Sequence, residues 1–452
     1  MPERMSTARQ IAYATGGPGF FAIDITVGAI LLYFCLPPEN RGLEAQVPEV
    51  VFLGFLTAFG VATIVARAVD SIATPLIGHA SDRSRSAWGR RRSFMIYGFV
   101  PMLGIPLLAY WPPGAAGSVV NAVWIAVLLC FYFVCAAMYT APYYALVPEI
   151  ARTDEERANL TRLMALVSFP MGGILMAWPM GLDLGREAGL APTESIRWMV
   201  VALVAAGSLL CAIPFFAIDE RRFTVSTPSS LSLLEALRQT LRNRIFLIFL
   251  AAHSVFILGA SLVLPLSPYI ATVLLGRSEG FGAYLGISLG GMLALGYAVV
   301  PELRRRFGAR RTVIGCVGLF LLASGCLGLI HPDAPGGAYD FSNLALAYTA
   351  FGGIGFSIAG IHIVTRVLLG RIIDEDARRS GASRSAMFLG VEEALRKYML
   401  GLAAALIAFL FVQFGKSTQE PLGVLLVGPI AALAGLASAI LFALLPKGRG
   451  DS

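Results

Sequence analysis

The sequence predicts an all-α membrane protein with twelve transmembrane helices arranged as two six-helix bundles. Three observations support this fold class. The 452 residues are 57% hydrophobic and only 14% charged, which is too little charge to cover a soluble domain of this size. The apolar residues form long blocks, and basic residues concentrate in alternate connections between the blocks. The longest polar connection divides the blocks six and six.

Twelve apolar blocks are long enough to cross a bilayer, since a helical span needs about 20 residues. Only helices satisfy every backbone group inside lipid over such a length. The first block is too long for a signal peptide, and we expect it to remain uncleaved. The predicted spans are centred near residues 24, 65, 102, 130, 172, 205, 257, 290, 320, 356, 398 and 434.

The basic residues predict the orientation of these spans. Of the 35 lysines and arginines, 26 lie in the two termini and five alternate connections. Short loops rich in Lys and Arg stay in the cytoplasm. We therefore expect a multi-pass protein of the cell (inner) membrane with both termini cytoplasmic. The same placement argues against nucleic acid as a partner, because the basic excess marks orientation and contact with anionic headgroups.

The longest cytoplasmic connection, with the polar centre TVSTPSSLS, separates two halves. We expect an N-terminal bundle over residues 1–217, a cytoplasmic linker over 218–244 and a C-terminal bundle over 245–452. A short repeat supports the division, since WGRRRSF follows the second span and FGARRTV follows the eighth. Paired six-helix halves of this kind are the architecture of the major facilitator fold.

The eighth span carries three glycines at intervals of four residues, Gly282, Gly286 and Gly290. Small residues at this spacing let helix backbones approach closely. The pattern therefore favours tight helix packing, and a moving interface is the alternative.

Three further patches carry a family resemblance. VARAVDSIATPLIG leads into SDRSRSAWGRRRSF, YTAPYYALVPEIARTDEER ends the fourth span, and RIIDEDARRSG precedes a span that contains Lys397. Together they resemble the glycoside–pentoside–hexuronide:cation symporter family, a melibiose permease-like branch of the major facilitator superfamily. The resemblance implies a secondary active transporter that works by alternating access. Its partners would be a small-molecule substrate, a coupling cation and the lipid bilayer.

The loop after the second span predicts a cytoplasmic gate. An aspartate beside arginines at a helix end can form charge-assisted hydrogen bonds to a neighbouring helix. Such a cluster can hold the cytoplasmic side shut in one state and release it in another. Simple anchoring of the loop is the alternative, and the resemblance favours the gate. The predicted gate residues are Asp82, Arg83, Gly89, Arg90 and Arg91.

Two carboxylates inside spans predict a cation or proton site, because a charge at mid-bilayer is costly and usually functional. Asp24 lies near the centre of the first span. Asp70 follows Arg67 by three residues, which puts both on one helix face, so a static ion pair is the alternative. The resemblance puts Thr74 and Thr140 where the family has further acids. We expect coupling through Asp70, Asp24, Thr74 and Thr140, with a proton rather than sodium, and uncoupled transport is the alternative.

The resemblance also implies a substrate site. Tyrosines of the fourth span would provide an aromatic platform for a sugar ring, with packing as the alternative. Lys397 matches a family lysine, although pairing with nearby acids such as Glu392 or Glu393 would make it structural. The predicted substrate residues are Tyr139, Tyr143, Tyr144, His362, Arg366 and Lys397.

These features predict a cation symporter for a sugar or glycoside. A transporter of a lipid-like or other amphipathic solute is the first alternative, because the expected sugar-binding acids are missing. A non-transporting membrane assembly protein of the same fold is the second. The four histidines form no HExxH motif, and the six cysteines form no CxxC pair. We expect no enzyme activity, no metal or other cofactor, and a monomer.

Overall fold

A computed structural model describes residues 5–39, 41–84, 86, 88–151, 154–217, 238, 240–332, 336–380 and 385–446. Backbone contacts divide the chain into two compact units. Unit 1 comprises Met1–Pro37, Arg41–Phe52 and Thr57–Ser229, and unit 2 comprises Pro38–Asn40, Leu53–Leu56 and Ser230–Ser452. This boundary falls inside the predicted linker 218–244, of which only residues 238 and 240–244 belong to the described ranges.

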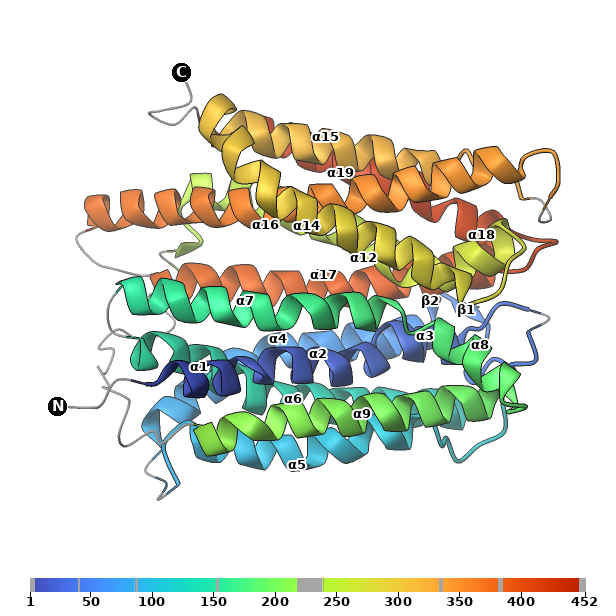
Figure 1. The fold of residues 1–452 in the computed structure, drawn as a ribbon, viewed down its shortest axis with the longest axis horizontal. Coiled ribbons are helices and arrows are strands. Elements are labelled where there is room, and N and C mark those ends of the chain that lie inside the picture. Colours follow the sequence, from blue (N-terminus) through green and yellow to red (C-terminus); the bar gives the residue numbers. More distant parts are fainter. Residues whose placement is uncertain are drawn as a thin grey trace. The chain divides into compact units, whose positions relative to one another are not determined.

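Unit 1 contains the helices drawn from blue to green in Figure 1. A short hairpin of strands β1 (Val51–Phe52) and β2 (Leu56–Thr57) precedes α4, and its segment Leu53–Leu56 is assigned to unit 2. The helices are α1 (Thr7–Ala14), α2 (Gly16–Val27), α3 (Ala29–Cys35), α4 (Ala58–Arg83), α5 (Arg92–Ala109), α6 (Val119–Ile150), α7 (Asp154–Met176), α8 (Met180–Glu187) and α9 (Pro192–Ala217).

The first described helix of unit 2 is α12, and its membrane-length segment continues through a 3₁₀ turn and a π-helical turn to Leu274. The elements are α12 (Arg244–Val263), η1 (Leu264–Leu266), α13 (Ser267–Tyr269), η2 (Ile270–Leu274), α14 (Phe281–Phe307), α15 (Ala309–Leu327), α16 (Asp340–Ser380), α17 (Ser385–Phe414), α18 (Leu422–Leu425) and α19 (Val427–Ala443).

Within the described ranges, eleven helical segments are long and apolar enough to cross a membrane. The predicted span centres fall inside these segments, except the one at residue 172. That centre lies in α7, a helix that opens with the charged stretch DEER and is not among the eleven. The hydrophobic pattern therefore located a helix at every predicted span, which agrees with the predicted all-α membrane fold.

Three of the long helices begin at side-chain caps. Thr57 accepts a hydrogen bond from the backbone N–H of Gly60 at the start of α4 (3.0 Å). Ser118 does the same for α6, and Asn243 for α12. Such caps satisfy backbone donors that the first helical turn leaves free, and each stabilises its helix by about 1 kcal/mol.

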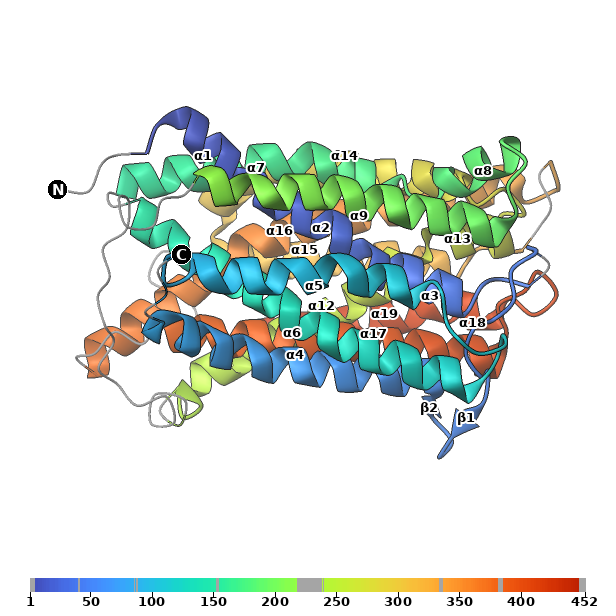
Figure 2. The same ribbon diagram turned by 90° about the horizontal axis from the view of Figure 1, so that it is seen from below.

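In unit 1, α6 packs against α4 and α5, and α2 packs against α9 (Figure 2). The α2–α9 contact depends on two glycines. A Cβ atom at Gly19 would lie 2.8 Å from the carbonyl oxygen of Gly207, and one at Gly207 would lie 2.7 Å from that of Gly19. The small residues thus bring the two backbones into direct contact, as is typical of helix pairs in lipid.

In unit 2, α16 packs along α14 and α15, and α19 packs along α12 and α15. The predicted glycine stripe of α14 contributes only in part. A Cβ at Gly282 would lie 2.8 Å from the backbone of Ser267, whereas a Cβ at Gly290 would meet nothing within 4 Å. The backbones of α14 and α16 approach closely at Gly355, where a methyl group would overlap the carbonyl oxygen of Leu289.

We expect Gly355→Ala to destabilise unit 2 by about 1–3 kcal/mol, because the added methyl group must push the α14 backbone away from α16. Thermal unfolding of the purified protein in detergent measures the effect. Gly290→Ala is the matched control, since its methyl group enters open space and alanine favours the helix. Equal melting temperatures for the two variants would contradict the packing described for Gly355.

Candidate functional site

Asp70 on α4 is buried in an ion pair. Only 2% of the residue is exposed, and Arg67 Nη1 lies 3.3 Å from Asp70 Oδ2. The Arg67 guanidinium also lies over the ring of Phe133 on α6, 4.0 Å from its centroid. The structure therefore contains the Arg67–Asp70 ion pair that the sequence left open as an alternative, and it covers the pair with an aromatic ring.

Of the two threonines predicted beside Asp70, the structure brings one into contact with it. Thr74 Oγ1 lies 2.9 Å from the carbonyl oxygen of Asp70 and 3.3 Å from Asp70 Oδ1, as its position one turn later on α4 permits. Thr140 on α6 instead donates to the carbonyl oxygen of Ala136 on its own helix (2.8 Å).

Asp24 on α2 is half-buried and reaches α6. Tyr132 is fully buried, and its hydroxyl donates to Asp24 Oδ1 (3.4 Å). The next residue, Phe133, is the one that covers Arg67, and the rings of Tyr132 and Phe133 are 5.2 Å apart in an edge-on arrangement. Two neighbouring residues of α6 thus contact both intramembrane carboxylate groups of unit 1, directly at Asp24 and through Arg67 at Asp70.

Two of the three predicted platform tyrosines are packing residues in this structure. The rings of Tyr13 and Tyr143 stack at 4.7 Å, and each hydroxyl donates to the carbonyl oxygen of the other residue. The Tyr139 hydroxyl donates to the carbonyl oxygen of Cys211 on α9 (3.0 Å). Both platform tyrosines are at most 1% exposed, whereas Tyr144 is 50% exposed. Tyr139 and Tyr143 therefore tie α6 to α1 and α9, and Tyr144 alone of the three reaches the surface of the unit.

The basic loop before α5 binds the end of α6. Gly89 has φ +105°, a conformation that favours glycine, and it turns the chain into α5. Arg90 Nη2 lies 2.8 Å and Arg91 Nη2 lies 3.1 Å from Glu149 Oε1. Arg91 Nη1 also donates to the carbonyl oxygen of Ala145. We name the Arg90–Arg91–Glu149 group the arginine clamp.

Two predicted gate residues lie outside this clamp. Arg83 is exposed at the C-terminal end of α4, and the side chain of Asp82 lies outside what the structure describes. The sequence prediction missed Glu149, although it lies within the quoted patch YTAPYYALVPEIARTDEER. A carboxylate at a helix end, facing a cluster of arginines, was the available signal.

In unit 2, ionisable side chains from three helices contact one another. His253 Nδ1 on α12 lies 3.1 Å from Glu392 Oε1 on α17. Arg366 Nη1 on α16 lies 3.3 Å from Glu392 Oε2. His253 and Glu392 are 6% and 4% exposed, whereas the Arg366 side chain is 61% exposed. We name these residues the unit 2 triad; the sequence prediction included Arg366 but missed His253.

The other predicted residues of unit 2 surround this triad in sequence. His362 lies one turn before Arg366 on α16, and its Nδ1 is 2.9 Å from the Tyr297 hydroxyl on α14. Glu393 binds Arg396 through both oxygens, at 2.5 and 2.8 Å, within α17. Lys397 follows and is half-buried. The two adjacent acids of α17 thus differ, because Glu392 binds other helices and Glu393 binds its own.

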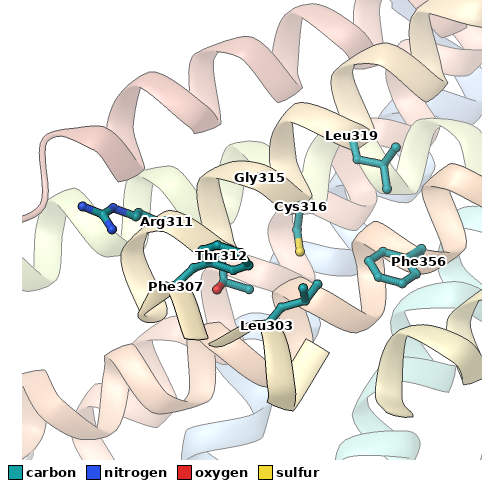
Figure 3. A pocket seen from close by; sticks show the side chains of 8 residues that line it. All are labelled: Leu303, Phe307, Arg311, Thr312, Gly315, Cys316, Leu319 and Phe356. Carbon is teal, nitrogen blue, oxygen red and sulfur yellow. The ribbon is translucent and has the colours of Figure 1, made fainter. Parts of the chain in front are cut away.

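A pocket of about 350 Å³ lies among α14, α15 and α16 (Figure 3). The Thr312 hydroxyl donates to the carbonyl oxygen of Gly308 (2.8 Å), and Arg311 points away from the other labelled side chains. Most of the side chains that line this pocket are apolar. Its lining residues are Leu303, Phe307, Arg311, Thr312, Gly315, Cys316, Leu319 and Phe356. In the ranges that the structure covers, no group of three or more His, Cys, Asp or Glu could hold a metal ion.

Comparison with known proteins identifies the family. A family model described as MFS/sugar transport protein matches residues 13–445. The chain belongs to this family. The match to the MFS/sugar transport family confirms the major facilitator fold and the symporter resemblance that the sequence predicted, and the family is one of transport proteins.

Relatives within the MFS/sugar transport family are distant. The inner membrane symporter YicJ of Escherichia coli (strain K12) is 27% identical over 63% of this chain and 58% of its own length. The isoprimeverose transporter of Lactiplantibacillus pentosus is 23% identical over 59% of this chain and 55% of its own length. The chain thus spans little more than half of the length of these relatives. The crystal structure of the nucleoside transporter NupG (D323A mutant) shares the fold, with a TM-score of 0.69, 12% identity, and coverage of 97% of this chain and 99% of that one.

Proposed function

We propose that this MFS/sugar transport protein is a secondary active transporter that works by alternating access and couples the movement of a sugar or glycoside to that of a proton. The buried Asp70, held by Arg67 and Thr74 inside a membrane-length helix, is the observation that carries the proposal. Burying a carboxylate inside a membrane-spanning helix costs considerable free energy. In membrane proteins such a carboxylate usually marks an ion or proton site. The substrate class is suggested by the relatives described above, a symporter and an isoprimeverose transporter.

The surroundings of Asp70 favour a proton over sodium. Arg67 occupies one carboxylate oxygen, and Thr74 adds a neutral hydroxyl in place of a second acid. A sodium ion needs several oxygen ligands and would lie beside a guanidinium of the same charge, whereas a proton needs only one oxygen. Asp24, with its hydrogen bond from Tyr132, is the second carboxylate of this proposed site.

The remaining predicted residues receive proposed roles from their positions. The arginine clamp would close the cytoplasmic side in one state, with Arg83 and Gly89 shaping the loop around it. Sugar contacts would come from side chains that reach the surface of their unit or lie half-buried there, namely Tyr144, His362, Arg366 and Lys397. Tyr139 and Tyr143 would fix the position of the part of α6 that carries Tyr144. We propose a monomer in the cell membrane with both termini in the cytoplasm.

Transport by the purified protein in proteoliposomes tests this function. With an inward proton gradient, we expect at least one of isoprimeverose, lactose and a phenyl glucuronide to accumulate above its outside concentration, because proton entry supplies the free energy. An inward sodium gradient at equal pH should give no accumulation, and protein-free vesicles are the control. Accumulation of a lysophospholipid and of none of the sugars would overturn the substrate class, and no proton-driven accumulation of any probe would overturn coupled transport.

A further inference from the structure

The unit 2 triad is a tertiary contact, and its members lie far apart in the chain. Glu392 uses one carboxylate oxygen for His253 and the other for Arg366, so it joins α17 to α12 and α16. Both His253 and Glu392 are more than nine-tenths buried. Charged or protonatable groups at this depth are costly to maintain, and their presence calls for a function beyond packing.

The triad has room for one additional proton. Arg366 and Glu392 balance each other, so the group is neutral when His253 is neutral. His253 Nδ1 faces Glu392, while His253 Nε2 is buried and has no hydrogen-bond partner. Histidine is the side chain whose charge changes most readily near neutral pH. Uptake of a proton from water would turn His253 and Glu392 into an imidazolium–carboxylate pair. The bound proton would then belong to the pair and not to either residue alone.

Other ionisable groups around the unit 2 triad do not prevent His253 and Glu392 from binding a proton. Arg396 of α17 and His362 of α16 interact electrostatically with Glu392 and with each other, and His362 also interacts with His253. Arg396 is neutralised by Glu393, and His362 is hydrogen bonded to Tyr297 of α14. The helix α19, which packs along α12, contains no ionisable side chain.

We propose that His253 and Glu392 bind one transported proton in unit 2, next to the Arg366–Glu392 ion pair, in addition to the proton bound at Asp70 in unit 1. This role rests on the function proposed above. Proton binding weakens the Glu392–Arg366 ion pair, because the negative charge of the carboxylate is then shared with the imidazolium of His253. The exposed guanidinium of Arg366 is thereby released to bind oxygen atoms of the substrate, and proton and substrate binding strengthen each other.

Proton binding by the triad can be measured without a substrate. Infrared difference spectra of the protein in lipid nanodiscs, between about pH 8 and about pH 5, bracket the usual range of histidine titration. We expect a hydrogen/deuterium-sensitive band from the pair that Glu392→Gln and His253→Gln each remove. His331→Gln is the control and keeps the band, since His331 is exposed and stacks on Tyr339 outside the triad. Wild-type spectra from both triad variants would overturn the proposal.

Transport then tests whether this proton moves with the sugar. Each coupled proton raises the limiting accumulation tenfold per pH unit, since a tenfold ratio is worth about 1.4 kcal/mol. With the membrane potential clamped and a gradient of about two pH units, loss of one of two protons lowers accumulation by about 100-fold. We expect this loss in Glu392→Gln and in His253→Gln, and wild-type accumulation in His331→Gln. Unchanged accumulation in both triad variants would overturn the proposal.

Failure of sugar transport and misfolding of a variant can each be distinguished from failure of the triad to bind a proton. If the wild-type protein transports none of the sugars, the proposed function fails, while the infrared spectra still decide whether the triad binds a proton. If Glu392→Gln does not fold, His253→Gln carries the test, because it removes the proton acceptor and leaves the Arg366–Glu392 ion pair in place.

Discussion

Replacing Asp70 with asparagine is expected to lower proton-driven sugar accumulation by about 100-fold at a gradient of about two pH units, while sugar exchange at equal pH stays within about twofold of wild type. Asparagine keeps the size of the side chain and its contact with Thr74, but it neither takes up nor releases a proton. Arg67 then carries an uncompensated charge, which imitates the cation-loaded state and still permits exchange. Uptake and exchange of the radiolabelled sugar in the same proteoliposomes measure both quantities.

Asp183→Asn is the matched control for this experiment. Asp183 also pairs with an arginine three residues away on its helix, at 3.2 Å, but both side chains of that pair are partly exposed on α8. We expect wild-type accumulation and exchange in this variant. If Asp70→Asn accumulates sugar as the wild type does, the Arg67–Asp70 pair is purely structural.

Glu149→Ala is expected to destabilise unit 1 by about 3–5 kcal/mol, because it leaves two largely buried guanidinium groups without their shared carboxylate. The Glu149 side chain is 13% exposed, and those of Arg90 and Arg91 are 22% and 10% exposed. Denaturant unfolding in detergent, followed by circular dichroism, measures the loss. Transport turnover should fall as well, since the arginine clamp fixes the loop before α5 to the end of α6.

Glu302→Ala is the control that separates the effect of burial on stability from the effect of the number of ion pairs. Glu302 on α14 also binds two arginines, Arg305 at 2.7 Å and Arg306 at 2.6 Å, but those side chains are 78% and 69% exposed. Exposed ion pairs contribute about 0–1 kcal/mol, so we expect this variant to unfold almost as the wild type does. An equal loss in Glu302→Ala and Glu149→Ala would show that burial of the arginine clamp contributes nothing.

Hydropathy and local spacing predicted the features that are determined within a single segment, namely the helices and the contacts between residues of one helix. The helix at every span centre follows from the need to satisfy the backbone in lipid. The contacts of Asp70 with Arg67 and Thr74 follow from the three- and four-residue spacing on one helix. The family match from residue 13 to residue 445 agrees with the resemblance drawn from the basic loop and the two acidic patches.

Contacts between distant segments could not be predicted in this way. His253 and Glu392 are 139 positions apart, so no periodicity connects them, and only the packing of α12 against α17 brings them together. Tyr139 and Tyr143 were expected to face a ligand because aromatic rings serve in sugar sites. In the structure, burial and the carbonyl oxygens of Tyr13 and Cys211 determine their orientation.

Tyr132 and Phe133 occupy consecutive positions on α6, and their rings therefore leave the helix about 100° apart around its axis. One ring meets Asp24 and the other covers the Arg67 partner of Asp70. A twist of this part of α6 must move both rings together. Rotation of α6 about its axis would therefore change the contacts of Asp24 and of Arg67 at the same time.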